Sequence, residues 1–252
     1  TNHFKNLDHL SFSGIETNPV LYLEQRILKL SNSNKSLIKG SIVHSLIDKK
    51  LKGEVLDLSS QTQEIQDILD NATKLIDQIK TTYPEVISSE QEFREVPLTT
   101  ITDLKDTDLT IKGTIDAIFR NPQTGNYLIV DWKIDRDPVA YAAEHRQQLA
   151  LYKSIYSKVN NIPEDKIQVY IGYVSTRKTI NDNTIGTLLD TRQPAKTSLT
   201  TLTKHIQTIV DWKADPQTFI QSLEDAIQKS QSNQTPLTRA IVEQYRKEKD
   251  KI

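Results

Sequence analysis

Gly113-Thr114-Ile115-Asp116 and Ile129-Val130-Asp131-Trp132-Lys133 are the two stretches of sequence that decide the fold. Each lies in a run rich in β-branched and aromatic residues, over residues 111–119 and 127–133, and such runs are typical of β-strands. Residues 121–126 between them read Asn-Pro-Gln-Thr-Gly-Asn, which favours a turn, so the two runs predict a hairpin. Side chains alternate along a strand, and Asp131 and Lys133 therefore share one face while Trp132 points to the other.

The predicted hairpin also brings chemical groups together, provided that Asp116 faces the same side as Asp131 and Lys133. Two carboxylates and one ammonium group then meet at a single point. A metal-dependent phosphodiesterase needs oxygen ligands for a hard divalent cation and a positive group beside the attacking water or the developing phosphate charge. The alternative is that this Asp-x-Lys triplet is a chance occurrence on the solvated face of an edge strand.

The chain contains a second copy of the same four letters, Val210-Asp211-Trp212-Lys213. This copy follows apolar residues at helical spacing and runs into a helix start at Asp215-Pro216. The flanks of the two copies do not match, so the sequence indicates no internal duplication. We therefore assign the chemistry to the first copy, residues 130–133, alone.

Two further motifs flank the hairpin: Gly40-Ser41-Ile42-Val43-His44 lies upstream, and Gln148-Leu149-Ala150-Leu151-Tyr152 lies downstream. In this order the chain resembles the RecB-like branch of the PD-(D/E)XK nuclease superfamily, with its Gly-x-x-x-His helix, Gly-x-x-Asp strand, Asp-x-Lys strand and Gln-x-x-x-Tyr helix. Residues 10–13 and 18–23 also resemble the opening segment of these domains, so the resemblance covers about residues 10 to 175. It implies an α/β fold with a restriction-endonuclease-like core, in which a central mixed β-sheet is flanked by helices and followed by a C-terminal helical extension.

The resemblance implies a role for each motif residue. The implied metal ligands are His44, Asp116, Asp131, the backbone carbonyl of Trp132, and Glu92, for which Glu90 is a close competitor. The implied catalytic residues are Asp116, Asp131, Lys133, Gln148 and Tyr152, with Lys133 orienting the attacking water and stabilising charge on the phosphate. The alternatives are that His44 is a satisfied structural histidine and that Gln148 and Tyr152, at i and i+4, merely belong to an amphipathic helix.

The overall charge gives no sign of nucleic-acid binding, because the formal net charge is only −1. Any DNA groove must therefore be a local basic patch. Candidate phosphate contacts near the motifs are Arg136, Arg146, Lys153, Arg177 and Lys178, and the alternative for each is an ordinary solvated charge.

The expected cofactor is Mg²⁺ or Mn²⁺. Many relatives have a cysteine before the proline of the opening segment, where it helps to hold an iron–sulfur cluster, but this chain has Asn18 there and no cysteine anywhere. A cluster needs thiolate ligands, so no iron–sulfur cluster is expected. The absence of cysteine also fits a reducing compartment, and we expect a cytoplasmic protein without a membrane span. The absence of any methionine, even at the start, leads us to expect a trimmed or excised piece, for which one domain of a larger protein is one origin.

The function that we expect is a metal-dependent DNA nuclease, an exonuclease on DNA ends or single strands that works with a helicase in DNA repair or recombination. The resemblance implies DNA and a helicase domain or subunit as partners. This chain has no phosphate-cradling Gly-rich loop of its own, so any helicase motor must lie elsewhere. One alternative is a catalytically silent module that binds DNA or scaffolds a helicase complex. Another is a helical interaction protein, which explains the C-terminal region but not the carboxylates on strands.

The remaining pattern predicts the order of the elements and two domains. Residues 1–192 are expected to form the nuclease core with its N-terminal helices, and residues 193–252 a helical extension packed on the same domain. Helices are expected from Asn18-Pro19, through His44 to residue 51, over 61–82, from Asp137-Pro138 to 159, and after residue 194 with starts at 215–216 and 235–236. Further strands are expected over residues 86–96, 109–119, 127–133, 167–175 and 184–189.

Overall fold

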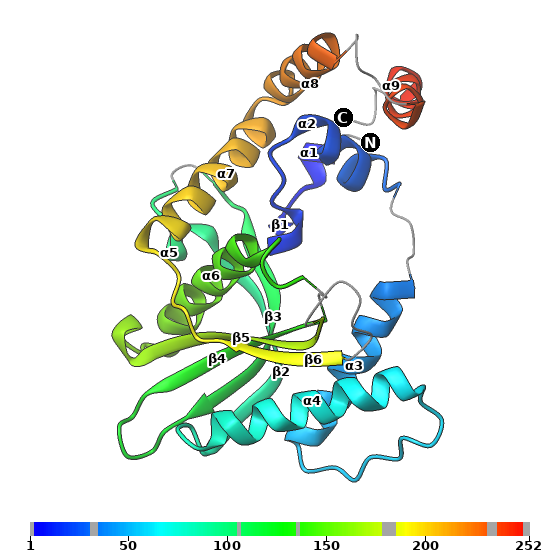
Figure 1. Cartoon of the computed structure of the whole chain (residues 1–252). Coiled ribbons are helices and arrows are strands. Elements are labelled where there is room, and N and C mark those ends of the chain that lie inside the picture. Colours follow the sequence, from blue (N-terminus) through cyan, green and yellow to red (C-terminus); the bar gives the residue numbers. More distant parts are fainter. Residues whose placement is uncertain are drawn as a thin grey trace. The chain divides into compact units, whose positions relative to one another are not determined.

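The computed structural model describes residues 3–30, 35–104, 107–134, 137–177, 185–230 and 236–248 (Figure 1). The chain forms two compact units. The first unit contains Thr1–Ser33, Arg94–Gly113 and Thr200–Ile252, and the second contains Asn34–Phe93 and Thr114–Leu199. The predicted division at residue 193 stays a prediction.

The second unit carries most of a mixed β-sheet. Its strands are β2 (Glu85–Pro97) and β3 (Thr110–Arg120), which both begin or end in the first unit, and β4 (Tyr127–Lys133), β5 (Ile167–Arg177) and β6 (Ile185–Asp190). Strand β3 pairs with β2 and runs antiparallel to β4, β4 runs parallel to β5, and β5 runs antiparallel to β6. The α/β fold with a mixed central sheet is therefore confirmed, and strand β4 has the predicted bounds.

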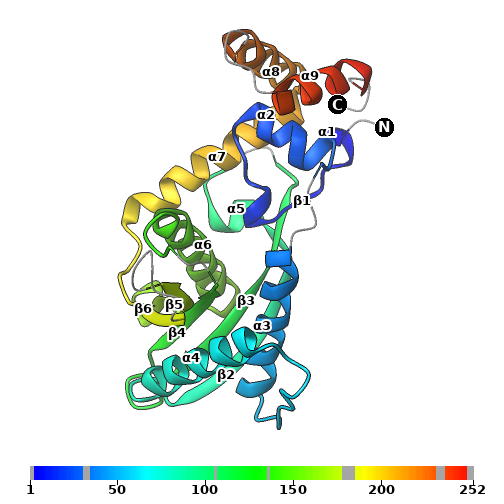
Figure 2. The same cartoon turned by 45° about the vertical axis from the view of Figure 1, so that its right-hand side comes forward.

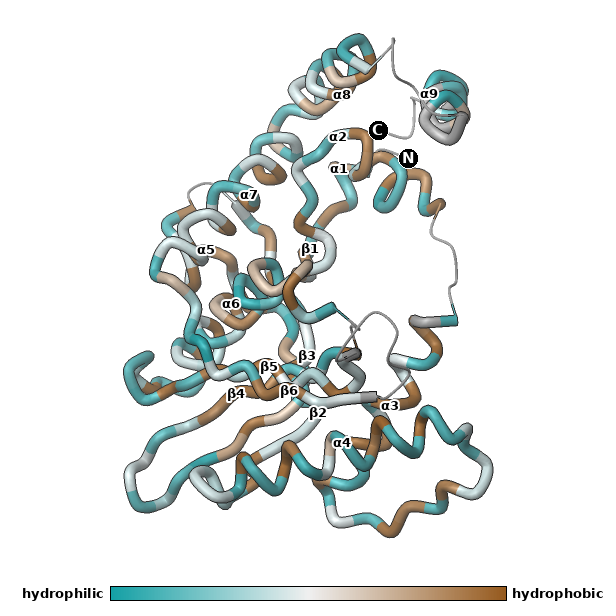
Figure 3. The backbone as a smooth tube through the Cα atoms, in the orientation of Figure 1, coloured by the Kyte–Doolittle hydropathy of each residue, from teal (hydrophilic) through white to brown (hydrophobic). Residues whose placement is uncertain are grey.

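Helices α3 (Lys35–Leu51) and α4 (Gln63–Lys80) cover one face of this sheet (Figures 1 and 2). Thr62 caps α4, because its hydroxyl accepts the backbone N–H of Ile65 at 3.3 Å. Hydrophobic and hydrophilic residues alternate along α4 in Figure 3, and the predicted apolar stripe of this helix is buried. The stripe consists of Ile65, Ile68, Leu69, Leu75, Ile76 and Ile79.

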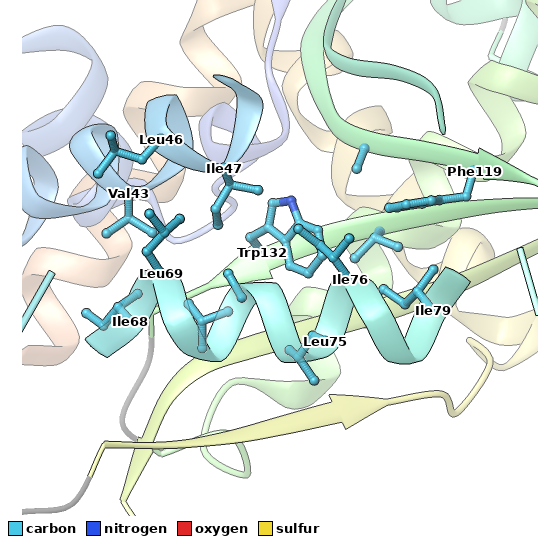
Figure 4. Packing of buried hydrophobic residues seen from close by; sticks show 14 of the residues in the cluster. Val43, Leu46, Ile47, Ile68, Leu69, Leu75, Ile76, Ile79, Phe119 and Trp132 are labelled. Atoms are coloured by element: carbon cyan, nitrogen blue, oxygen red, sulfur yellow. The ribbon is translucent and has the colours of Figure 1, made fainter. Parts of the chain in front are cut away.

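The hydrophobic core between these helices and the sheet contains the indole of Trp132, which Figure 4 shows among side chains of α3 and α4. Ala117 and Phe119 of β3 and Val130 of β4 lie in the same cluster. Because neighbours along a strand point to opposite faces, Asp116 of β3 and Asp131 and Lys133 of β4 are turned away from this core. Strand alternation thus separates the apolar face from the polar one, as predicted.

Helix α6 (Ala142–Asn160) packs against β4 and β5, and Figures 1 and 2 show it on the face of the sheet opposite α4. The predicted start at Asp137-Pro138 is wrong. The Asp137 side chain instead accepts the backbone N–H groups of Val139 and Ala140 at 3.0 and 3.3 Å, which forms a turn. The short 3₁₀ helix η3 (Glu164–Lys166) precedes β5.

The first unit is mainly helical. It contains α1 (His3–Asn6), β1 (His9–Leu10), η1 (Phe12–Gly14), α2 (Pro19–Tyr22), the π-helix η2 (Leu23–Ile27), α5 (Leu98–Ile101), most of α7 (Lys196–Ala214), α8 (Pro216–Ser230) and α9 (Pro236–Glu248). Asn18 caps α2 as predicted, because its side chain accepts the N–H groups of Val20 and Leu21. Strand β1 pairs in parallel with the start of β3, at Thr110 and Ile111.

The second Val-Asp-Trp-Lys copy lies in helix α7, as predicted, and its Trp212 and Lys213 have structural contacts. Trp212 packs edge-on against Phe219, with ring centroids 4.9 Å apart. Lys213 donates to the backbone carbonyls of Phe4 and Leu7 at 3.1 and 2.7 Å, at the end of α1. Within the described part of the chain, no helix is long and apolar enough to cross a membrane.

Candidate active site

Two buried carboxylates face each other across the pairing of β3 and β4. Ala117 pairs with Val130 in this antiparallel register, which places Asp116 opposite Asp131. Both side chains are buried, and Asp116 Oδ2 accepts the backbone N–H of Trp132 at 2.7 Å. This bond holds the Asp116 carboxylate across the strand pair, so the structure brings together the two aspartates that the sequence singled out.

His44 and Glu90 complete a group of possible metal ligands around Asp116. His44 Nδ1 lies 3.4 Å from Asp116 Oδ1 and 3.5 Å from Glu90 Oε1. One nitrogen and two carboxylate oxygens from these three residues all lie within 4.8 Å of one another. Helix α3 supplies His44, while Val43, Leu46 and Ile47 beside it anchor the helix in the core.

An irregular backbone positions Glu90 in strand β2. Its φ of 48° lies in the left-handed region, which a residue other than glycine rarely adopts. Ser89 beside it donates a hydrogen bond to Asp48, one helical turn after His44, and so ties this part of β2 to α3. The backbone at this point therefore turns the Glu90 carboxylate towards His44.

Glu92, the acidic ligand implied by the sequence, is exposed and is not in the group formed by His44, Glu90 and Asp116. The structure places its competitor Glu90 there instead. In a regular strand, residues 90 and 92 share a face, and the sequence gives no sign of the positive φ that distinguishes them. Ser89 and Asp48 carry no recognisable motif either, so sequence reasoning missed their contact.

The pKa values of His44 and Asp116 reflect the surplus of carboxylates around them. Burial disfavours the charged form of His44, but hydrogen bonding to Asp116 and Glu90 and the charge of Asp131 outweigh this and raise the pKa of His44 to about 10. Burial, together with the charge of Asp131, raises the pKa of Asp116 to about 6, against the opposing effects of His44 and the Trp132 N–H. The site thus favours positive charge, which a divalent cation would supply.

Lys133 lies on the other side of Asp131 and begins a chain of polar contacts. Its Nζ lies 3.0 Å from Asp131 Oδ2 and donates to Gln148 Oε1 at 3.0 Å. Gln148 Nε2 in turn donates to the Tyr152 hydroxyl at 3.2 Å. Burial raises the pKa of Tyr152 to about 12, so its hydroxyl stays protonated, and its ring packs edge-on against Phe93. The sequence-predicted set Asp131, Lys133, Gln148 and Tyr152 is therefore contiguous.

The five residues predicted to contact DNA differ in their surroundings, and only some of them are described by the structure. Arg146 donates to Asp190 Oδ2 at 3.0 Å, so at least part of its charge serves an ion pair within the second unit. Lys153 is half-buried on α6, and Arg177 ends β5. The side chain of Arg177 and the whole of Arg136 and Lys178 lie outside the described residues. Contact of these five residues with DNA remains a prediction.

The donor set fits a hard divalent cation. Asp131 Oδ2 is buried and accepts no hydrogen bond of regular geometry from any described residue, although Lys133 is close enough for an ion pair. Carboxylate oxygens suit Mg²⁺ and Mn²⁺, and an imidazole nitrogen is better tolerated by Mn²⁺ than by Mg²⁺. The role of the Trp132 carbonyl as a ligand stays a prediction.

Comparison with known proteins agrees with this geometry. No curated protein shows significant similarity to the chain. The model of one protein family, described as the PD-(D/E)XK nuclease superfamily, matches residues 9–247, which is nearly the whole chain. With this match and with Asp116, Asp131 and Lys133 placed together on adjacent strands, the chain belongs to the PD-(D/E)XK nuclease superfamily.

Proposed function

We propose that this protein is a deoxyribonuclease that uses Mg²⁺ or Mn²⁺ to hydrolyse phosphodiester bonds. The observation that carries the proposal is the position of Asp131. This residue lies opposite Asp116, which belongs to the group of possible metal ligands, and its Oδ2 atom lies 3.0 Å from Lys133 Nζ. In this arrangement, the carboxylates proposed to hold the cation lie next to the ammonium group proposed to face the phosphate. Membership of a nuclease superfamily supports the same reaction class.

The proposed ligands are Asp116, Asp131, His44 and Glu90, with the Trp132 carbonyl as a further oxygen donor. A bound divalent cation supplies Lewis-acid stabilisation of phosphate charge and lowers the pKa of a coordinated water. The carboxylates of Asp116 and Asp131 are buried and fixed by the strand pairing, so they need little reorganisation to accept a cation. Such preorganisation is what makes electrostatic stabilisation effective in an active site.

Lys133 is the proposed electrophilic residue. Its ammonium group orients the attacking water and stabilises the negative charge that develops on the phosphate. Gln148 is a positioning residue that acts through Lys133, because its carbonyl oxygen accepts from Nζ while its amide donates to Tyr152. Tyr152 is buried against Phe93, so the chain of contacts rests on a fixed ring.

The order of the Gly-x-x-x-His, Gly-x-x-Asp, Asp-x-Lys and Gln-x-x-x-Tyr motifs supports a RecB-like assignment within the superfamily. We extend the proposal accordingly: the enzyme is an exonuclease on DNA ends or single strands, located in the cytoplasm, and it works with a helicase in repair or recombination. Arg136, Arg146, Lys153, Arg177 and Lys178 are the proposed contacts to the DNA backbone.

The test is cleavage of end-labelled linear and circular DNA, single-stranded and duplex, with Mg²⁺, Mn²⁺ or EDTA. Asp131→Asn and Lys133→Ala should each lower metal-dependent cleavage by at least a hundredfold, as expected when an electrostatic group of a transition state is lost. Asp211→Asn is the matched control, because Asp211 occupies the same Val-Asp-Trp-Lys letters but is exposed on α7.

Cleavage that needs metal, disappears in both site variants and persists in Asp211→Asn supports the proposal, and failure to cut circular DNA identifies an exonuclease. Full metal-dependent cleavage by either site variant would refute the assigned roles. If the wild-type protein binds DNA but does not cut it with either metal, even with a helicase supplied, the module that scaffolds a helicase complex becomes the better explanation.

A further inference from the structure

The first unit contains a cavity of about 590 Å³ that is separate from the residues of the candidate active site. Its lining includes Arg26, Lys29 and Lys112, together with the histidine–tyrosine pair formed by His3 and Tyr22. A volume of this size lies within the range of small-molecule sites in proteins. All of its lining residues belong to the first unit, from the N-terminal segment and the start of β3.

Arg26 is held in the cavity by close packing over Gly14. A Cβ atom at position 14 would lie 2.7 Å from Arg26 Nη2 and 3.3 Å from Ser11 Oγ, so a larger residue there would displace the guanidinium from this position. Arg26 Nη2 lies 3.5 Å from Ser13 Oγ, and its Nε is buried without a hydrogen-bond partner among the described residues. A half-buried guanidinium that lines a cavity is suited to an anionic ligand, because its accessible N–H groups can donate charge-assisted hydrogen bonds.

The charge of the lining favours the same kind of ligand. Arg26, Lys29 and Lys112 are accompanied by one carboxylate, Asp8, which leaves a net charge of +2 when histidines are left out of the count. None of the three cations forms an ion pair within the described part of the chain, whereas Asp8 Oδ1 lies 2.6 Å from His9 Nδ1. Among the described residues, therefore, no carboxylate neutralises these three cations through a direct ion pair.

His3 reports on this positive environment. Burial and the nearby charges of Lys29 and Arg26 lower the pKa of His3 to about 4, so its imidazole is neutral at physiological pH. His3 Nε2 lies 2.9 Å from the Tyr22 hydroxyl, which fixes the ring at the wall of the cavity. The positive charge that attracts an anion to the cavity therefore comes from Arg26, Lys29 and Lys112 and does not depend on protonation of His3.

We propose that this cavity binds the terminal phosphate monoester of a DNA strand. A phosphate monoester carries about −1.5 to −2 charges near neutral pH, which matches the net charge of the lining. The cavity is also larger than a single phosphate group requires, so it has room for part of the attached nucleotide.

A second cavity indicates that the ligand is a strand end rather than a continuous backbone. This cavity of about 560 Å³ shares Asp8, His9 and Lys112 with the first. It adds Arg94 but also Glu95 and Asp108, so carboxylates outnumber cations there. Further phosphates are therefore disfavoured beside the first cavity. The shared chemistry is a terminal phosphate, and the experiment decides whether it comes from a 5′ or a 3′ end.

The test is fluorescence anisotropy with the full chain in EDTA, where metal-dependent cleavage cannot occur. The probes are three single-stranded oligonucleotides of one sequence, with a 5′-phosphate, a 3′-phosphate or only hydroxyl ends, each labelled away from the end under test. We expect one phosphorylated end to bind at least tenfold more tightly than the hydroxyl end. Inorganic phosphate should compete, and it should shift the NMR signals of His3 but not those of His145, which lies in the second unit.

The preference should fall to less than threefold in Arg26→Gln and in the double variant Lys29→Gln/Lys112→Gln. The matched control is Lys74→Gln/Lys158→Gln, which removes the same charge from exposed positions on α4 and α6. Lys29 and Lys112 are both exposed, so their double variant should fold even where Arg26→Gln does not.

Equal binding of phosphorylated and hydroxyl ends would overturn the proposal, as would a preference that survives in the folded cavity variants. A preference lost equally in the control variant would also overturn it, because general charge would then explain the binding. Since binding is read without metal, its outcome is independent of whether the protein cleaves DNA.

Discussion

Substitution of Gly172 by alanine tests how tightly the core is packed behind the strand that carries Asp131 and Lys133. Gly172 of β5 pairs with Trp132 of β4, and the Trp132 ring lies across it. A Cβ atom at position 172 would lie 2.4 and 2.5 Å from Trp132 Cε3 and Cζ3. Non-bonded carbon atoms prefer separations of about 3.5–4.0 Å, so the ring must move by about 1 Å.

The cost of this movement follows from the surroundings of the ring. Trp132 is buried in the core under α3 and α4, and its Nε1 has no hydrogen-bond partner among the described residues, so packing alone holds it. Overpacking of a well-filled core costs about 1–3 kcal/mol. We expect Gly172→Ala to lower the free energy of unfolding by about 2–3 kcal/mol, because the displaced ring is fully buried on a central strand of the sheet and has no free space to move into.

The assay is urea unfolding of the metal-free protein, with Gly40→Ala as the control. Gly40 lies within helix α3, where an added Cβ meets only Ile134 Cδ1 at 3.8 Å, an ordinary contact. Alanine is favoured over glycine in a helix by about 1 kcal/mol, so this control should be neutral or stabilising. A Gly172→Ala variant within about 0.5 kcal/mol of the wild-type protein would refute the packing argument.

Three further predictions concern neighbouring parts of the second unit. Asn71 of α4 donates to the backbone carbonyls of Val174 and Gly186 at 3.1 and 3.3 Å, so Asn71→Leu should destabilise the protein by about 1–3 kcal/mol in urea unfolding; unchanged stability would contradict this account of the buried amide. At position 90, Glu90→Gly should be more stable than Glu90→Ala by about 1 kcal/mol, since only alanine is strained at a φ of 48°, and equal stabilities would show that the backbone relaxes. Ion pairs with arginine outweigh burial and lower the pKa of Asp190, so its contribution to stability is full above the ordinary aspartate pKa and is lost as pH falls through the lowered value. Asp190→Asn should therefore be about 1–3 kcal/mol less stable than the wild-type protein at pH 7, with the difference shrinking below about pH 4; a difference independent of pH would exclude the ion pair as its cause.

Much of the sheet and its chemistry was predictable from local pattern. The β-branched runs around Asp116 and Asp131 indicated two paired strands, and period-two alternation indicated that Trp132 lies in the core while its neighbours face the site. Helical spacing before the second Val-Asp-Trp-Lys copy likewise indicated that Trp212 and Lys213 belong to a helix. Each of these inferences depends on residues close together in the sequence, whose periodicity shows directly which face is buried.

The remaining features depend on contacts between residues far apart in the sequence. Glu90 rather than Glu92 lies beside His44, because a positive φ turns the backbone at Glu90 and a hydrogen bond from Ser89 ties β2 to α3. Gly172 is required only because the ring of Trp132, forty residues earlier in the chain, crosses its strand.

The sequence by itself thus determined the hairpin, the face on which its two aspartates and Lys133 lie, and the absence of thiolate ligands. Only the tertiary structure decided which glutamate joins His44, how Gln148 holds Lys133, and that Arg26 lines a cavity with Lys29 and Lys112. The physical reason is that side-chain alternation is a property of the local backbone. An irregular φ, a buried polar contact or a cavity is instead stabilised by tertiary packing, which local sequence does not record.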